Sequence, residues 1–134
     1  MTIKGILARF AALYTGLVAA LAGTRYFLDI DGGIAVDIVI LGLSIYAVCW
    51  AFGRENGRYF EGTEKAKIVV GFIAISVSVQ GGFLWLAVSQ SSGQISGAAA
   101  LFSLGLVGVV HSVLIYLFVG LAKRPLLKQG VITA

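Results

Sequence analysis

The stretch GRENGRYFEGTEKAK, residues 53–67, decides how this chain is organised. It holds seven of the sixteen charged side chains, and long apolar runs lie on both sides of it. A helix needs about 20 mainly apolar residues to cross a bilayer, and these runs are long enough. The stretch therefore predicts a polar connection between two hydrophobic halves that lie in a membrane.

The composition of the whole chain agrees with this interpretation. Hydrophobic residues make up 59% of the 134 residues, charged residues make up 12%, and the mean hydropathy is +0.99. A soluble domain carries about 25% charged residues, so about half of the usual solubilising charge is missing. The net charge of +4 is explained by basic residues beside the anionic head groups of a bilayer, and nucleic acid is not expected as a partner.

Four apolar segments predict one all-α domain, an integral membrane four-helix transmembrane bundle. The expected spans are residues 6–24, 34–52, 68–88 and 98–122, with residues 53–67 as the central loop. In this loop Thr63 is expected to cap the third helix, and Tyr59 and Phe60 are expected to lie at the membrane interface. Pro125 is expected to end the fourth helix, because proline cannot continue one.

Basic residues predict the orientation of the bundle. The N-terminal segment, the central loop and the C-terminal segment together hold nine lysines and arginines, whereas the two loops on the other side hold Arg25 alone. Short loops rich in lysine and arginine stay in the cytoplasm. We therefore expect a multi-pass protein of the bacterial inner membrane with both termini in the cytoplasm. The loop that follows Arg25 is acidic, and Gly32-Gly33 predicts a turn in it.

The first apolar segment has a second interpretation as a cleaved signal peptide. The apolar run is long enough to span a bilayer, and Thr24-Arg25-Tyr26-Phe27 follows it directly, which favours a retained helix. In this helix Ala12, Gly16 and Ala20 repeat every fourth residue, and small residues at this spacing let another membrane helix approach closely. A second small-residue face is expected on the fourth helix, formed by Gly105, Gly108 and Ser112.

Gln80 and His111 are the strongly polar side chains expected deep in the membrane. They lie at nearly the same depth on helices joined by a short loop, so a hydrogen bond between them at the midplane is expected. No carboxylate is expected at the depth of His111, since all six acidic residues fall in loops or at helix ends. An ionisable side chain inside a bilayer also permits a proton path, which is the functional alternative to a structural role.

Catalytic chemistry is not expected of this chain. One histidine and one cysteine do not make a metal site, and neither a Ser/His/Asp arrangement nor a phosphate-binding loop is present in the sequence. No cofactor, metal or catalytic residue is therefore predicted. The central loop offers a docking site for a partner or a lipid head group, formed by Arg54, Glu55, Asn56 and Arg58. Its alternative role is that of a solvated connection.

The segment FGRENGRYFEGTEKAK before a serine-bearing third span resembles small uncharacterised four-span inner-membrane proteins of proteobacterial genomes. The chain is also similar in plan to immunity proteins that protect a cell from membrane-depolarising toxins. Together with the residues above, this favours a non-enzymatic protein that binds a membrane-protein partner or a second copy of itself as an immunity, accessory or regulatory subunit. The alternative is a small oligomeric channel or transporter, in which Gln80 and His111 line a midplane path.

Overall fold

The computed structural model describes residues 1–29 and 33–133. These residues form four helices: α1 (Ile3–Leu28), α2 (Gly33–Asn56), α3 (Gly62–Gln90) and α4 (Gly97–Lys128). Each helix is long and apolar enough to cross a membrane. The expected all-α fold of four membrane-length helices is confirmed. The turn expected at Gly32-Gly33 includes residue 32, which lies outside the described residues, and Gly33 is the first residue of α2.

The outward faces of the helices are apolar. In each helix, only 17% to 28% of the most apolar 18-residue window is buried. Large side chains such as Leu101, Phe102 and Val109 are exposed. Apolar surface of this extent is unfavourable in water, whereas lipid chains solvate it as well as a protein core does. The fold is therefore compatible with a small multi-pass integral membrane protein.

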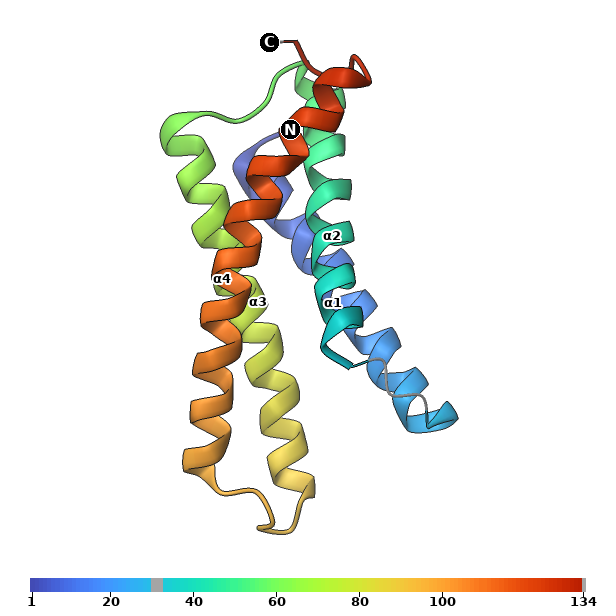
Figure 1. The fold of residues 1–134 in the computed structure, drawn as a ribbon, viewed down its shortest axis with the longest axis vertical. Coiled ribbons are helices and arrows are strands. Elements are labelled where there is room, and N and C mark those ends of the chain that lie inside the picture. The colour runs from blue at the N-terminus through green and yellow to red at the C-terminus, as the bar shows by residue number, and fades with distance from the viewer. Residues whose placement is uncertain (30–32, 134) are drawn as a thin grey trace.

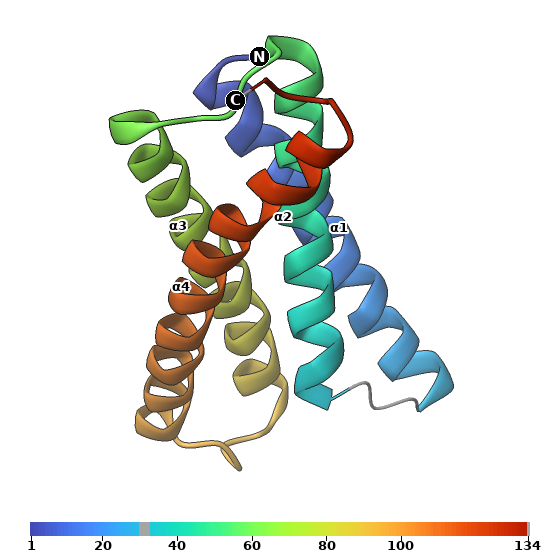
Figure 2. The ribbon, with the colours of Figure 1, turned by 45° about the horizontal axis from the view of Figure 1, so that its top comes forward.

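The four helices form a ring in the order α1, α2, α4, α3, and each one packs against its two neighbours (Figure 1). Both termini and the connection between α2 and α3 lie at one end, which we call the termini end. The opposite end, where residues 91–96 join α3 to α4, is called the distal end. Toward the distal end the α1–α2 pair diverges from the α3–α4 pair (Figure 2).

The buried core lies in the half of the bundle nearer the termini end. Phe10 of α1 stacks on Phe72 of α3 with ring centroids 4.1 Å apart, and all atoms of both side chains are buried. Phe52 of α2 and Phe60 meet at 5.2 Å. Aromatic side chains from three helices and a connecting segment therefore fill the space between the two helix pairs.

Tyr59 and Phe60 belong to this core, so the expectation that they lie at the membrane interface is wrong. Their side chains are 5% and 1% exposed. The Tyr59 hydroxyl donates a hydrogen bond of 2.5 Å to the carbonyl oxygen of Val119 in α4. Burial raises the pKa of Tyr59, so the phenol remains a protonated donor. Its polar tip has a partner, which makes burial of the ring favourable.

The central connection is shorter than expected, because α2 continues to Asn56 and α3 begins at Gly62. Only residues 57–61 join the two helices. Gly57 and Gly62 have φ angles of +65° and +51°, a backbone conformation that glycine adopts without strain. The N-cap residue of α3 is Glu61, and Thr63 lies inside the first turn, so the expected cap at Thr63 is wrong. A glycine at each side of the connection allows the chain to reverse within five residues.

Pro125 lies inside α4, which runs on to Lys128, so the expectation that it ends the helix is also wrong. Proline removes one backbone donor and bends a helix, and it does not always stop one. The last turns of α4 cross toward α2 (Figure 2). Leu126 is fully buried there, and Ile132 reaches Gly53, where an added Cβ would lie 2.7 Å from its Cγ2. Burial of these side chains stabilises the bent end of the helix.

The contact between α1 and α3 depends on Gly71. A Cβ at this position would overlap the end of the Leu7 side chain and lie 3.2 Å from Leu7 Cγ. We expect Gly71→Leu to lower the free energy of unfolding by about 1–3 kcal/mol, the usual cost of overpacking. Thermal or denaturant unfolding in detergent measures this change. Gly120→Leu is the matched control, since nothing lies within 4 Å of a Cβ there. Equal losses in the two variants would contradict the packing argument.

Candidate functional site

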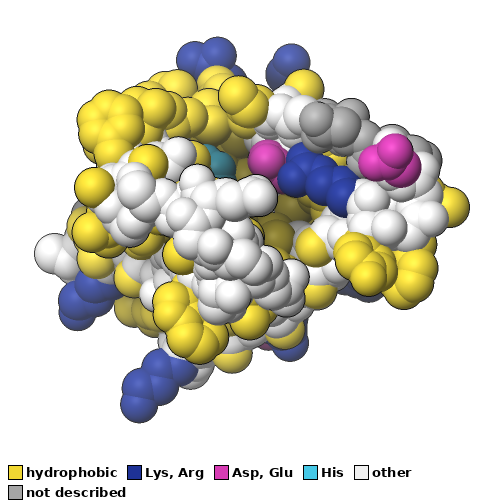
Figure 3. Space-filling model, turned by 90° about the horizontal axis from the view of Figure 1, so that it is seen from below, with side chains coloured by type: hydrophobic (Ala, Val, Ile, Leu, Met, Phe, Trp, Pro, Cys, Tyr) yellow, Lys and Arg dark blue, Asp and Glu magenta, His cyan; other side chains and the backbone are white. Residues whose placement is uncertain are grey.

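A cleft opens at the distal end, where the two helix pairs diverge. It has a volume of about 180 Å³, and eight residues from α2, α3 and α4 line it: Ile34, Asp37, Ile38, Gln80, Leu106, Val107, Val110 and His111. Seen from this end, a histidine, a carboxylate and a basic side chain lie side by side in a hollow that apolar side chains border on one side (Figure 3). We call it the distal cleft. The aromatic core lies between it and the termini end.

His111 occupies the inner part of the distal cleft and bonds to Ser76 of α3. The distance between Ser76 Oγ and His111 Nδ1 is 2.7 Å. Serines elsewhere in the helices, such as Ser44 and Ser112, donate to a carbonyl of their own helix. Within the described residues the Ser76 hydroxyl has no hydrogen bond besides that to His111. Which of the two groups donates depends on the tautomer of the imidazole, since a hydroxyl can both donate and accept.

Gln80 bonds to Tyr14 of α1, with Nε2 donating to the phenolic oxygen at 3.1 Å. The expected hydrogen bond between Gln80 and His111 is therefore replaced by two separate ones. Ser76 and Gln80 lie one turn apart on α3, which packs against both α4 and α1. One of the two side chains reaches each neighbour, so both polar groups are satisfied without meeting each other. Gln80 and His111 still line the same cleft.

Asp37 is the feature of this site that the sequence did not predict. Its carboxylate lines the distal cleft together with His111, although no carboxylate was expected near the histidine. Arg25 of α1 lies 3.8 Å from it, between Nη2 and Oδ1. Asp37 lies close to the distal end of α2. Because the two helix pairs diverge there, the cleft extends inward from Asp37 as far as His111. The cleft therefore presents a carboxylate and an imidazole to one small cavity.

The small residues expected on α1 lie on its exposed surface, and Ala12 also lines a groove beside α2. Ala12, Gly16 and Ala20 are exposed, and nothing lies within 4 Å of a Cβ built at Gly16. A shallow groove of about 290 Å³ follows this face between α1 and α2, and we call it the α1–α2 groove. Its lining residues are Arg9, Ala12, Leu13, Ala47, Val48 and Ala51. The spacing of Ala47 and Ala51 by four residues is the sequence signal that was missed.

The second expected face, on α4, is divided between two environments. Gly105 is exposed and open, whereas a Cβ at Gly108 would contact Val77 of α3 at 3.5 Å. The Ser112 hydroxyl donates to the carbonyl of Gly108 at 2.7 Å, within the same helix. Gly108 thus belongs to the packing between α3 and α4. A role of this face in binding a partner stays a prediction.

The four residues expected to dock a partner are engaged within the chain. Arg9 Nη1 donates to Glu55 at 2.8 Å, and the N-terminal amino group donates to Asn56 Oδ1 at 3.0 Å. Arg58 forms two hydrogen bonds to Glu64, of 2.8 and 3.3 Å, and this carboxylate raises the pKa of Arg58. The Arg54 guanidinium lies 5.2 Å from the centre of the Trp50 ring. These contacts favour the role of a connection that joins α1, α2 and α3, and docking stays a prediction.

Neither a search for metal-binding side chains nor a comparison with known proteins points to a further site. Within residues 1–29 and 33–133, no three His, Cys, Asp or Glu side chains converge as they would around a metal ion. Comparisons of the chain with family models, curated proteins and solved structures find no match. The distal cleft, the α1–α2 groove and the surface of the bundle are therefore the candidate functional features of this protein.

Double-mutant cycles distinguish the observed polar pairs from the expected one. We expect Ser76→Ala and His111→Ala to show a coupling energy of about 0.6 kcal/mol, the average for hydrogen bonds between membrane helices. The Gln80→Leu and His111→Ala cycle is expected to give a smaller value. Ser78→Ala is the control partner, because Ser78 bonds only to Ala74 of its own helix. Unfolding in mixed micelles supplies the energies, and a larger coupling for Gln80 than for Ser76 would contradict the geometry.

Proposed function

We propose that this protein is a non-enzymatic protein of the bacterial inner membrane that binds a partner within the membrane, as an immunity, accessory or regulatory subunit. The observation that carries the proposal is the α1–α2 groove with the open face of α1 beside it. Ala12, Ala47 and Ala51 line the groove, and Gly16 continues the small-residue face. Because these side chains are small, the backbone of a partner helix can come close to the backbone of α1.

Physical chemistry favours a helix as the occupant of such a face. Lipid removes the hydrophobic driving force between helices, so association depends on close van der Waals contact and on the small residues that permit it. Some small residues of the bundle are covered, since Gly71 lies against Leu7 and Gly53 lies against Ile132, whereas Gly105 and Gly120 are open. Ala12, Gly16 and Ala20 form an exposed face with a spacing of four residues.

The orientation with both termini in the cytoplasm is part of the proposal. Nine of the ten lysines and arginines belong to the three segments that meet at the termini end, and Arg25 is the tenth. This asymmetry supports placing the termini end in the cytoplasm. The distal cleft then opens to the periplasm.

Matched leucine substitutions test the partner hypothesis. Gly16→Leu and Gly120→Leu both add a leucine where a Cβ meets nothing within 4 Å, and only Gly16 lies on the small-residue face. Tagged proteins are isolated from their native membrane in mild detergent, and stoichiometric partners are identified by mass spectrometry. We expect a partner or second copy to be lost from Gly16→Leu and retained by Gly120→Leu and His111→Ala. Retention of the same partner by Gly16→Leu would refute the role of this face.

A channel or transporter is the second candidate. The observation that favours it is that Gln80, His111 and Asp37 line one cavity. Tyr116 is another polar side chain that could line such a path, but it lies outside this cavity in a groove nearer the termini end. The buried ring stack of Phe10 and Phe72 argues against a continuous path in this conformation.

Flux measurements separate the second candidate from the first. If the protein conducts ions or protons, His111→Ala and Gln80→Ala are expected to abolish flux into liposomes while the proteins remain folded. If it binds a partner and does not conduct, the wild-type protein and both variants give the same flux as empty liposomes. Fluorescent pH and potential indicators measure both cases. Ser78→Ala, an exposed serine on the same helix as Gln80, is the control.

A further inference from the structure

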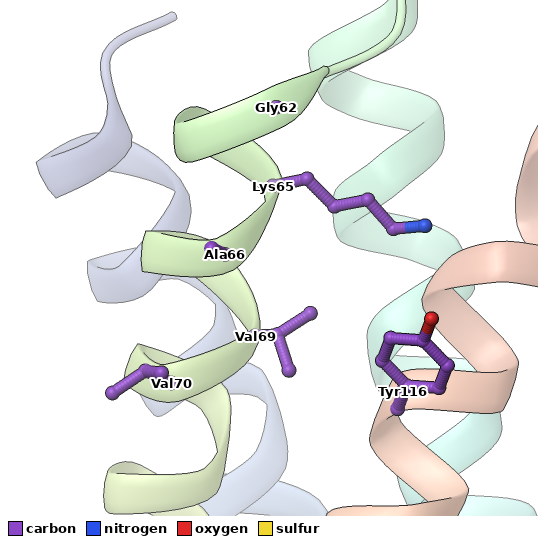
Figure 4. A pocket seen from close by; sticks show the side chains of 6 residues that line it. All are labelled: Gly62, Lys65, Ala66, Val69, Val70 and Tyr116. Carbon is purple, nitrogen blue, oxygen red and sulfur yellow. The ribbon is translucent and has the colours of Figure 1, made fainter.

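A separate groove lies between the first turns of α3 and the middle of α4 (Figure 4). Its volume is about 370 Å³, and the lining residues are Gly62, Lys65, Ala66, Val69, Val70 and Tyr116. In Figure 4 the Lys65 side chain extends across the groove toward the Tyr116 ring. We call this the Lys65 groove.

The walls of the Lys65 groove are apolar and open sideways onto the surface that faces lipid. Val70 is 65% exposed and Tyr116 is 61% exposed. An alkyl chain along Ala66, Val70 and the Tyr116 ring would contact apolar atoms over its length. In a bilayer an acyl chain is the molecule that reaches such a groove from the side.

The charge at the mouth of the groove is positive. Lys65 Nζ lies 5.5 Å from the centre of the Tyr116 ring. The nearby carboxylates pair with other cations: Glu64 lies 2.8 Å from Arg58, and Glu61 lies 3.9 Å from Lys123. Among the described residues, no carboxylate lies within ion-pair distance of Lys65. The ammonium is therefore available to an anion from outside the chain.

The start of α3 adds to the positive potential at the same place. The helix begins at Gly62, which also lines the groove, and the side chain of its N-cap residue Glu61 does not bond to the first backbone N–H groups. Free N–H groups and the helix dipole favour a phosphate at this end. Lysine and helix terminus thus lie on the same side of the apolar groove.

We propose that the Lys65 groove binds one anionic phospholipid. Its phosphate lies beside Lys65 and the first turn of α3, and one acyl chain lies along Val70 and Tyr116. A zwitterionic lipid carries its own cation near the phosphate, which Lys65 repels, so the groove prefers a lipid with net negative charge. The site is independent of the α1–α2 groove and of the partner proposed above.

Lipid binding by the purified protein tests the proposal. The protein is delipidated in detergent, mixed with phosphatidylglycerol or phosphatidylcholine, and examined by native mass spectrometry. Lys65→Gln is expected to lower the affinity for phosphatidylglycerol about fivefold, which corresponds to about 1 kcal/mol. Lys67→Gln makes the same change of charge two residues away at an exposed position outside the groove, and it is expected to retain the wild-type affinity.

A second variant tests the acyl-chain part of the site. Ala66→Trp places a large side chain in the groove at an exposed position, so it is expected to reduce retention without loss of helical circular dichroism. Equal losses in Lys65→Gln and Lys67→Gln would overturn the proposal, because they would show attraction by overall charge alone. Equal binding of phosphatidylcholine and phosphatidylglycerol, or a protein chain in place of lipid in the native complex, would also overturn it.

Discussion

The stack between Phe10 and Phe72 holds the two helix pairs together. It joins α1 to α3 at a ring distance of 4.1 Å, and both side chains are fully buried. Around it, Tyr59 and Phe60 fill the space that remains between the pairs, and the C-terminal segment covers Gly53. Within lipid, such contacts must be close to stabilise a fold, since transfer of apolar side chains from lipid into the core gains little. Gly71 and Gly53 matter because they let neighbouring side chains reach the backbone.

The two ends of the bundle differ in consequence. At the termini end, aromatic rings occupy the interior, including those of Tyr59 and Phe60 from the connection. At the distal end the pairs separate, and the distal cleft brings Asp37 and His111 to one cavity. The hydrogen bonds of Ser76 to His111 and of Gln80 to Tyr14 lie between these regions and attach α3 to both neighbours. Polar side chains are thus concentrated where the close packing ends.

The four helices could be predicted from the sequence because the bilayer leaves an apolar run few alternatives to a helix. The choice of partner by each polar side chain could not. Gln80 and His111 lie at matching depth, but Gln80 bonds to Tyr14 of α1 and Ser76 bonds to His111 of α4. The carboxylate of Asp37 is not expected near His111 from the sequence, because depth counted along a helix gives the distance between two side chains only where the helices pack side by side. Tyr59 was placed at the interface because its partner, the Val119 carbonyl, lies sixty residues away and carries no sequence signal.

The five-residue connection between α2 and α3 has a mechanical meaning. It starts at Gly57 and is followed by Gly62, the first residue of α3, and both glycines have left-handed conformations. Its two aromatic side chains are buried in the core. The α1–α2 and α3–α4 pairs are therefore packed together at the termini end and separated at the distal end. A small change in the angle between them would alter the width of the distal cleft most and the aromatic core least. The Gln80–Tyr14 bond joins α1 to α3 beside the distal cleft and would limit how far the two pairs can separate.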